Sequence, residues 1–501
     1  MRPPSRDDSR KGNGVESFVQ AERTQHQGST KILKKHFLAR AGEIGASQII
    51  RRGARFLFLI VVARKLGPNT FGVYAVLLAA VETLSLISGE GLIDYIAREG
   101  ARNPNILGQL FTQVTQLRLF YAALILPIAL LVLSLFPHSH NALAGAFWML
   151  LILFARAPLG SSQGAFRATH RSAVLIWIEV LQAAILLVAT TIYLISGASL
   201  ERVILAELVS NCAGAGAGVW MFRTIWQVGK ADLLKLRPLL KATFAFNLYP
   251  LITNIYDRVD LLLLFTLAGS TAAGIYVLPY RSVAVLQIVP FGLMTALLPI
   301  IAPTNSPTPG KSICSQISNL LFTLSLFPVL AITLLSNQMI EEFLGAQYHE
   351  SAIALRILIW SLVPMFVNFG LNTYLLARGC ERVFIRTASV CALVNIGANL
   401  LFIPRYSYVA AALVTIATEV VLLVQHSAII YRAFGFLPFQ HEFLVTSLVF
   451  FVFLLAALVG SFYLPNVAVV LLASLGLGVY SYKSGTVQSF IRSFTPQPTT
   501  G

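Results

Sequence analysis

The stretch Gly67-Pro68-Asn69-Thr70-Phe71-Gly72-Val73-Tyr74 lies between two long apolar runs. Its glycines, proline and asparagine predict a tight turn. A second stretch, Gly269-Ser270-Thr271-Ala272-Ala273-Gly274-Ile275-Tyr276, repeats both glycines and the tyrosine at a constant offset, since 269 − 67, 274 − 72 and 276 − 74 all equal 202. A repeat of this length in an apolar chain predicts two homologous halves of a membrane protein. The alternative is a coincidence between two turns, because Gly and Tyr are both common at membrane interfaces.

A second pair of repeated positions supports the duplication. Arg167 and Arg171 follow the fourth apolar run, and Arg378 and Arg382 follow the tenth, at an offset of 211 residues. The nine-residue difference between the two offsets is an ordinary change of loop length. We therefore expect two related halves.

The composition is typical of an integral membrane protein. Of its 501 residues, 56% are hydrophobic and only 12% are charged, and the mean hydropathy is +0.74, whereas soluble chains carry about 25% charged residues. The net charge of +16 sits in short loops and in the N-terminal tail, which argues against a nucleic-acid partner. The four cysteines have no CxxC spacing, so we expect them to be packing residues, with no metal site and no cofactor.

We expect an all-α, polytopic membrane protein, because about 20 apolar residues are needed to cross a bilayer as a helix. Residues 1–43 are polar and basic and predict a disordered cytosolic tail. The remaining chain divides into a first lobe at 44–222, a cytosolic linker at 223–241, a second lobe at 242–430, two C-terminal helices within 443–482, and a cytosolic tail at 483–501. About fourteen spans are predicted, at 44–64, 71–90, 115–136, 143–165, 173–195, 203–222, 242–266, 272–297, 313–335, 352–376, 384–403, 408–430, 443–463 and 466–482.

The distribution of basic residues predicts the orientation. With both termini in the cytoplasm, the outer loops hold only Arg64, Lys65, Arg202 and Arg405, which agrees with the excess of Lys and Arg on the inner side of membrane proteins. The outer loops are also short, the longest running from about Ser336 to Ser351. None of them is long enough for a catalytic domain, so we do not expect an enzyme.

Many charged residues lie within the predicted spans, where ionisable side chains are costly and usually functional. Arg51 and Arg55 share one helix face, and Asn254 and Arg258 lie on one polar stripe of the seventh span. These stripes predict a wet cavity between the halves, with a cationic track for an anionic substrate. Any single arginine is about equally compatible with a structural role as an anchor or a salt bridge. The candidate substrate-binding residues are Arg51, Arg55, Arg118, Arg156, Asn254, Arg258 and Arg281; the candidate ion-coupling residues, for H⁺ or Na⁺, are Glu82, Asp257 and Glu419.

The motifs resemble a known family. The run from Val62 to Tyr74, the dipeptides Gly91-Leu92 and Arg98-Glu99, and in the second half Asp257-Arg258 and Leu375 to Gly379, are similar to polysaccharide-transport (Wzx-type) flippases of the multidrug/oligosaccharidyl-lipid/polysaccharide (MOP) exporter superfamily. This resemblance implies a V-shaped, MATE-like pair of six-helix lobes with alternating access. It implies as cargo an oligosaccharide linked to undecaprenyl phosphate or pyrophosphate in a bacterial inner membrane. The resemblance to the lipid II flippase branch suggests that the last two helices hold the lipid tail.

Two other functions compete with this one. A cation-coupled multidrug exporter of the same superfamily would favour a cavity lined by carboxylates and aromatics, whereas intramembrane arginines outnumber Asp and Glu here. A membrane glycosyltransferase or polymerase would need catalytic residues on large outer loops. The sequence does not identify the glycan, the coupling ion, the contacts with membrane lipids or a partner polymerase.

Overall fold

A computed structural model describes residues 53–134, 140–195, 197, 199–229, 236–301, 307–439, 441–485 and 488. These residues form helices joined by turns, without any strand. The predicted N-terminal tail, most of the predicted C-terminal tail, the start of the first span and the middle of the linker lie outside the described residues. Within them, eleven helical segments are long and apolar enough to cross a membrane. The all-helical, multi-pass membrane architecture predicted from the sequence is therefore confirmed.

The chain begins with the helical segment Gly53–Ile87, called here the first hairpin. The helices that follow are α2 (Leu92–Arg102), α3 (Leu107–Ser134), α4 (His140–Ala168), α5 (Ser172–Ile195), α6 (Leu200–Arg223), α7 (Leu236–Leu286), α8 (Ile288–Ile301), α9 (Pro307–Leu344), α10 (His349–Leu358), α11 (Leu362–Ala377), α12 (Arg382–Phe434), α13 (His441–Gly460) and α14 (Asn466–Lys483). Short 3₁₀ turns lie at Pro104–Ile106, Ala346–Tyr348 and Ile359–Ser361.

Three of the longest helical segments are folded back on themselves. The first hairpin has a left-handed residue at Gly67 (φ 74°), α7 has one at Gly269 (φ 91°), and α12 has one at Ser407 (φ 51°). Phe58 and Tyr74 flank Gly67 and would be about 24 Å apart in a straight helix, yet their ring centroids are 6.3 Å apart. Each of these segments therefore contains two antiparallel helices.

Contacts across the other two breaks agree with this reversal. Asp260 and Tyr276, on either side of Gly269, are joined by a hydrogen bond of 2.5 Å. Cys391 and Thr418, on either side of Ser407, approach within 3.8 Å, sulfur to carbonyl oxygen. The chain reverses direction at all three positions.

The turn predicted at 67–74 is much shorter than expected. The reversal takes place at Gly67, and the helix resumes at Pro68. Glycine adopts positive φ without the Cβ clash of other residues, and proline suits the first turn of a helix, where its missing N–H has no helical partner to lose. The loop expected at residues 65–70 is therefore wrong, while the position of the turn is right.

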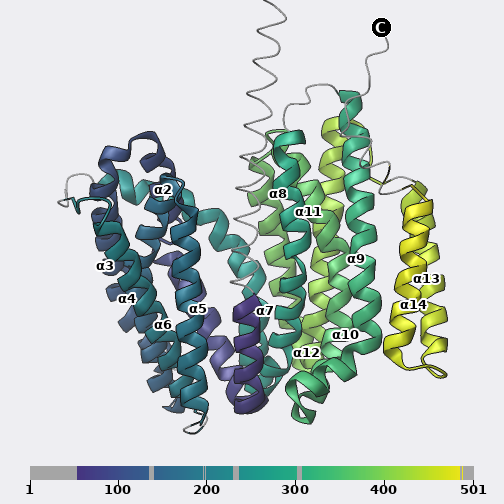
Figure 1. Cartoon of the computed structure of the whole chain (residues 1–501), viewed down its shortest axis with the longest axis horizontal. Helices are drawn as coiled ribbons and strands as arrows, with labels where there is room; N and C mark the ends of the chain where they lie inside the picture. The colour runs from purple at the N-terminus through teal and green to yellow at the C-terminus, as the bar shows by residue number, and fades with distance from the viewer. Residues whose placement is uncertain are drawn as a thin grey trace, which may run out of the picture.

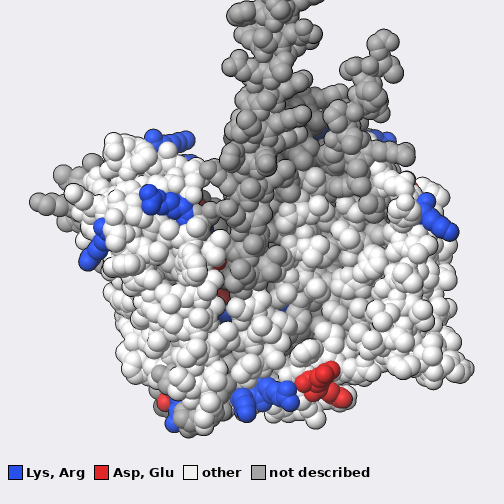
Figure 2. Space-filling model, viewed as in Figure 1, with Lys and Arg blue, Asp and Glu red and all other residues white. Residues whose placement is uncertain are grey.

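The helices gather into two bundles (Figure 1). Helices α2–α6 pack against one another, and α7–α12 form a second group. Helices α13 and α14 pack against α9 and lie at the edge of the second bundle, in yellow in Figure 1. On the face seen in Figure 2, most charged side chains gather at the top and bottom edges, and the broad band between them shows few. This band matches the apolar belt of a protein that crosses a bilayer.

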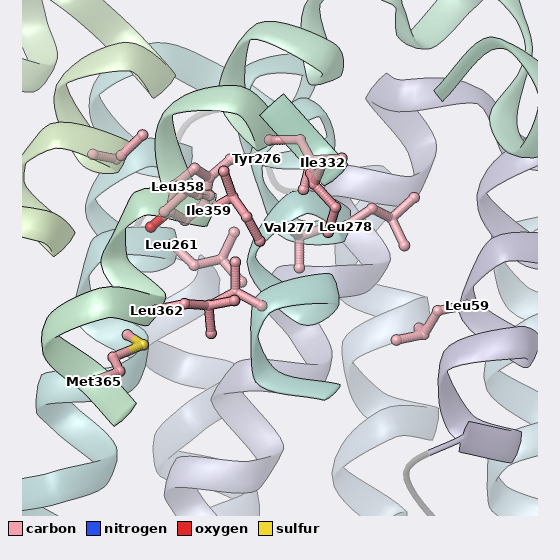
Figure 3. Close-up of a cluster of buried hydrophobic side chains, with 14 of the residues drawn as sticks. Leu59, Leu261, Tyr276, Val277, Leu278, Ile332, Leu358, Ile359, Leu362 and Met365 are labelled. Carbon is pink, nitrogen blue, oxygen red and sulfur yellow. The ribbon is translucent and has the colours of Figure 1, made fainter. Parts of the chain in front are cut away.

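The largest apolar core joins the first hairpin to the second bundle. Leu59, Tyr276, Leu358 and Leu362 are buried in it, and Figure 3 shows side chains from α7, α10 and α11 converging there. A separate cluster around Leu92, Phe111 and Phe166 holds α2, α3 and α4 together. The first hairpin thus lies where the two bundles meet.

The bundles touch near both ends. At one end, which we call the turn end, Asn69 pairs with Ser270 beside the two repeated turns. At the other, the α2 end, the Gly91 N–H donates to Asn247 Oδ1 at 2.6 Å, and the rings of Tyr95 and Phe246 are 5.9 Å apart. A space remains between these two contacts.

Candidate functional site

A cavity of about 700 Å³ lies between the bundles. It is lined by the first hairpin and by α4, α5 and α6 on one side, and by α7, α11, α12, Gln287 and Ser361 on the other. Its volume falls within the roughly 300–1,000 Å³ of sites that hold small molecules. It therefore has room for a small molecule.

The carboxylate of Glu82 forms ion pairs with two arginines in the cavity. Glu82 Oε2, from the first hairpin, lies 2.7 Å from Arg258 Nη2 and 3.4 Å from Arg281 Nη2. These arginines come from the two arms of α7. Next to them, Thr83 donates to Asn254 Oδ1 at 2.8 Å. Five side chains therefore link the two bundles at the middle of their length.

A second charged group lies on the first bundle. Glu207 Oε1, on α6, contacts Arg55 Nη1 at 2.5 Å and accepts a hydrogen bond of 2.5 Å from the Tyr74 hydroxyl. The Glu207 side chain is buried, whereas that of Arg55 is 28% exposed. Arg55 is thus anchored on one side and open toward the cavity on the other.

The second bundle holds its own buried carboxylates. Asp260 accepts from Tyr276, whose hydroxyl also lies 3.0 Å from Thr415 Oγ1. Glu419 accepts from Tyr256 at 2.6 Å and from Asn368 Nδ2 at 3.0 Å. Buried carboxylates are stabilised by such donors. These acids are therefore held by neutral partners, unlike Glu82 and Glu207.

Most of the predicted site residues do come together. The cavity lining includes four of the candidate substrate-binding residues and all three candidate ion-coupling residues: Arg55, Arg156, Arg258, Arg281, Glu82, Asp257 and Glu419. Arg51 lies outside the described residues. Asn254 is engaged by Thr83 and does not line the cavity.

Arg118 does not belong to the expected cationic track. Its side chain is buried within the first bundle, where Gly89 and Gly160 leave room for it. Its Nε and Nη1 atoms have no hydrogen-bond partner among the described residues. Helical periodicity cannot separate a cavity-facing arginine from one that points between helices of its own bundle, and this explains the error.

The charge balance of the cavity also differs from expectation. In the described part of the chain it is lined by four arginines, named above, and six carboxylates: Glu82, Glu179, Glu207, Asp257, Asp260 and Glu419. Arginines outnumber acids along the spans, but Arg118 and Arg356 lie elsewhere, and Arg356 contacts Ser336 and Asn337. The cavity is therefore a mixed site of both signs, and a purely cationic track is wrong.

Several polar residues of the cavity region were not among the site residues predicted from the sequence. Tyr74 and Tyr276 are the tyrosines of the two repeated stretches, and each donates to a buried carboxylate. Their partners Glu207 and Asp260 lie within apolar runs, and a buried carboxylate needs a hydrogen-bond donor. This need was the sequence signal that could have pointed to the two tyrosines. Asn368 and Tyr256, the partners of Glu419, have no comparable pattern in the sequence.

In the described part of the chain, no three His, Cys, Asp or Glu side chains are grouped as a metal ion would require. The cavity is a site built from ion pairs and hydrogen bonds. Such a site suits a polar, charged ligand that enters and leaves.

Comparison with known families decides the identity of the chain. The family model of polysaccharide biosynthesis proteins matches residues 38–305. This chain belongs to that family. The resemblance drawn from the motifs around Gly67 and Gly274 is therefore confirmed at the level of the family.

Solved structures with the same fold are transporters of the MOP superfamily. The lipid II flippase MurJ, in an inward closed conformation, is 14% identical with a TM-score of 0.65, covering 88% of this chain and 98% of its own. An inward-facing multidrug resistance MATE family transporter is 16% identical with a TM-score of 0.63; the match covers 75% of this chain and 92% of that transporter. A MOP superfamily transporter from Pyrococcus furiosus is 15% identical with a TM-score of 0.58; the match covers 80% of this chain and 97% of that transporter.

At these identities the likeness establishes the fold. None of the curated proteins compared matches the chain. This member of the polysaccharide biosynthesis family is thus a multi-pass membrane protein with the MurJ- and MATE-like fold.

Proposed function

We propose that this protein moves a lipid-linked oligosaccharide, carried on undecaprenyl phosphate or pyrophosphate, from the inner to the outer leaflet of a bacterial inner membrane. The observation that carries the proposal is the pair Arg258 and Arg281 facing a cavity between two bundles in a polysaccharide biosynthesis protein. A phosphate leaving water needs charges that replace its hydration. Guanidinium groups suit phosphate because they present several donors in a plane.

The topology that fits this function has fourteen crossings. Eleven candidate spans are present in the described residues, and three of them are hairpins that each cross twice. The first lobe is then residues 44–222 and the second 242–430, joined by the linker 223–241 and followed by α13 and α14. Both termini face the cytoplasm, which puts the turn end outside and the α2 end inside.

Transport then proceeds by alternating access. The contacts at the turn end and at the α2 end serve as outer and inner gates, which open in turn around a fixed central site, as in other transporters built from repeats. The cavity of about 700 Å³ accepts the phosphate and the first sugars, while the lipid tail stays in the membrane.

Asp257 and Glu419 are the proposed coupling residues. Asp257 is exposed to the cavity and has no ion pair or hydrogen bond within the described residues. Glu419 lies beside Asn368, whose Oδ1 atom is buried and has no hydrogen-bond partner among the described residues. Carboxylates and amide oxygens are the groups that carry H⁺ or bind Na⁺ in membranes.

A multidrug exporter coupled to cations is the second candidate. The excess of carboxylates over arginines in the cavity favours it, because cationic drugs pair with carboxylates. Its fold would be the same, so only the substrate separates the two functions.

The deciding experiment uses the full chain reconstituted in vesicles. Flipping of a fluorescent undecaprenyl-pyrophosphate-linked sugar would be measured from its accessibility to a membrane-impermeant quencher, alongside uptake of a cationic dye. Flipping without dye transport supports the lipid-linked cargo. Dye transport without flipping would replace it with the exporter.

A further inference from the structure

Glu82 joins the first hairpin to both arms of α7 through a single oxygen atom. Its Oε2 atom forms ion pairs with Nη2 of both Arg258 and Arg281. Counted along the helices, Glu82 lies about 22 Å from Gly67, and the two arginines lie about 16–18 Å from Gly269. The three charges therefore meet near the middle of a bilayer with a core of roughly 30 Å.

The two arginines have more donors than this carboxylate fills. Nε of Arg258 and Nε of Arg281 are buried and have no hydrogen-bond partner in the described part of the chain. Each guanidinium carries five N–H donors, and two positive charges face one negative charge. Arg156 lines the same cavity, and so does Arg55, which is already paired with Glu207.

A phosphate group would satisfy this arrangement better than the carboxylate does. It offers three acceptor oxygens and roughly two negative charges, and a pyrophosphate offers more oxygens still. Neither arginine needs to move far, because both already point at the same oxygen atom. Glu82, in contrast, can supply only two oxygens and one charge.

We propose that Glu82 is an internal substitute for the phosphate of the substrate. In the empty protein its carboxylate occupies the place between Arg258 and Arg281, and the incoming phosphate displaces it. This inference rests on the proposed function and assigns to Glu82 a role other than carrying the coupling ion. Glu82 is then a positioning residue that competes with the substrate.

Displacement has a mechanical consequence. Glu82 belongs to the first hairpin and both arginines belong to α7, so losing these ion pairs removes the charged link between the bundles. The neighbouring hydrogen bond between Thr83 and Asn254 loses its support at the same moment. A ligand without an anionic group cannot replace Glu82, so an uncharged lipid does not release the link.

The test compares binding of one probe, undecaprenyl phosphate, to the full chain in lipid nanodiscs. Removing the competing carboxylate by Glu82→Gln is expected to tighten binding by roughly tenfold, the scale of one charged hydrogen bond. Arg258→Gln and Arg281→Gln are expected to weaken it by at least as much. The exposed residue Glu341 provides the control, and Glu341→Gln should bind as the unchanged protein does.

The outcomes separate the inference from the proposed function. If the unchanged protein binds the probe while Glu82→Gln binds it equally or less well, the inference is overturned and the proposed function stands. If neither protein binds the probe, both fail. Inorganic pyrophosphate and undecaprenol, tested in parallel, show whether the headgroup or the lipid provides the binding; tight binding of undecaprenol would also overturn the inference.

A second measurement covers the case in which Glu82→Gln does not fold. Thr83→Cys and Asn254→Cys, on a background without the four native cysteines, report on the link while Glu82 is kept. Undecaprenyl phosphate is expected to slow formation of this disulfide several-fold, whereas undecaprenol is not. Equal rates with and without undecaprenyl phosphate would contradict displacement.

Discussion

Gly72 and Gly274 meet across the interface in a reciprocal way. A Cβ atom added to Gly72 would overlap the carbonyl oxygen of Ser270, and one added to Gly274 would overlap the carbonyl oxygen of Pro68. Each glycine thus packs on the residue four positions before the other, and both pairs are related by the offset of 202. The two repeated stretches therefore form a symmetric contact in which only glycine fits.

This contact leads to a first prediction. Gly72→Ala and Gly274→Ala should hold the turn end apart, since overpacking of a tight contact costs about 1–3 kcal/mol, and a shift of 1.4 kcal/mol is about tenfold in population. Transport should fall by a similar factor, and a cysteine placed at Asn69 should react faster with an external thiol reagent. Gly397→Ala is the control, because in the described part of the chain its added Cβ would have open space around it, apart from its own helix backbone. Normal transport by both glycine variants would show that this contact is not a gate.

The arginines of the cavity provide a second prediction. If Arg55 and Arg258 bind the phosphate through two parallel hydrogen bonds, lysine cannot replace them fully, although the charge is kept. Arg55→Lys and Arg258→Lys should impair glycan export, and the alanine variants should abolish it, at normal levels of protein in the membrane.

The control for these variants is the amount of folded protein, followed by fluorescence-detected size exclusion. A structural role would appear as loss of protein, because removing one partner of a buried pair leaves the other unpaired. Full export by a well-expressed Arg55→Ala, Arg258→Ala double variant would remove both residues from the site.

Coupling can be tested in vesicles with an imposed proton or sodium gradient. Asp257→Asn and Glu419→Gln remove the charge that a cation would need, so transport should become independent of the gradient and slower than in the unchanged protein. Collapse of either gradient with a selective ionophore identifies the ion. Transport that ignores both gradients in the unchanged protein would instead indicate a passive mechanism.

The orientation is open to a labelling experiment. Glu342→Cys near the turn end and Thr224→Cys after α6, both at exposed positions, are compared on a cysteine-free background in intact cells. We expect Glu342→Cys to react with an impermeant maleimide, and Thr224→Cys to react only after permeabilisation. Reaction of both from the same side would break the fourteen-span topology.

Much of the fold could be predicted because it depends on local properties of the chain. Runs of apolar residues define helices that cross a bilayer, and Gly67 and Gly269 mark reversals because glycine tolerates positive φ. The reversal at Ser407 (φ 51°) lies in the predicted gap between 403 and 408, although serine adopts this conformation less readily than glycine. The exact helix ends were predicted less well, since helices continue up to Gly67 on both sides.

By itself, the sequence determined that the chain lies in a membrane and that charged residues are buried in it, and it predicted two related halves. The tertiary structure decided which of these charges meet. Glu82 and Arg281 are 199 residues apart, yet they touch, while Arg118, on the same kind of apolar run, is buried within one bundle. The physical reason is that burial of an apolar face is encoded by periodicity along one helix, whereas the partner of a buried charge depends on how separate helices pack.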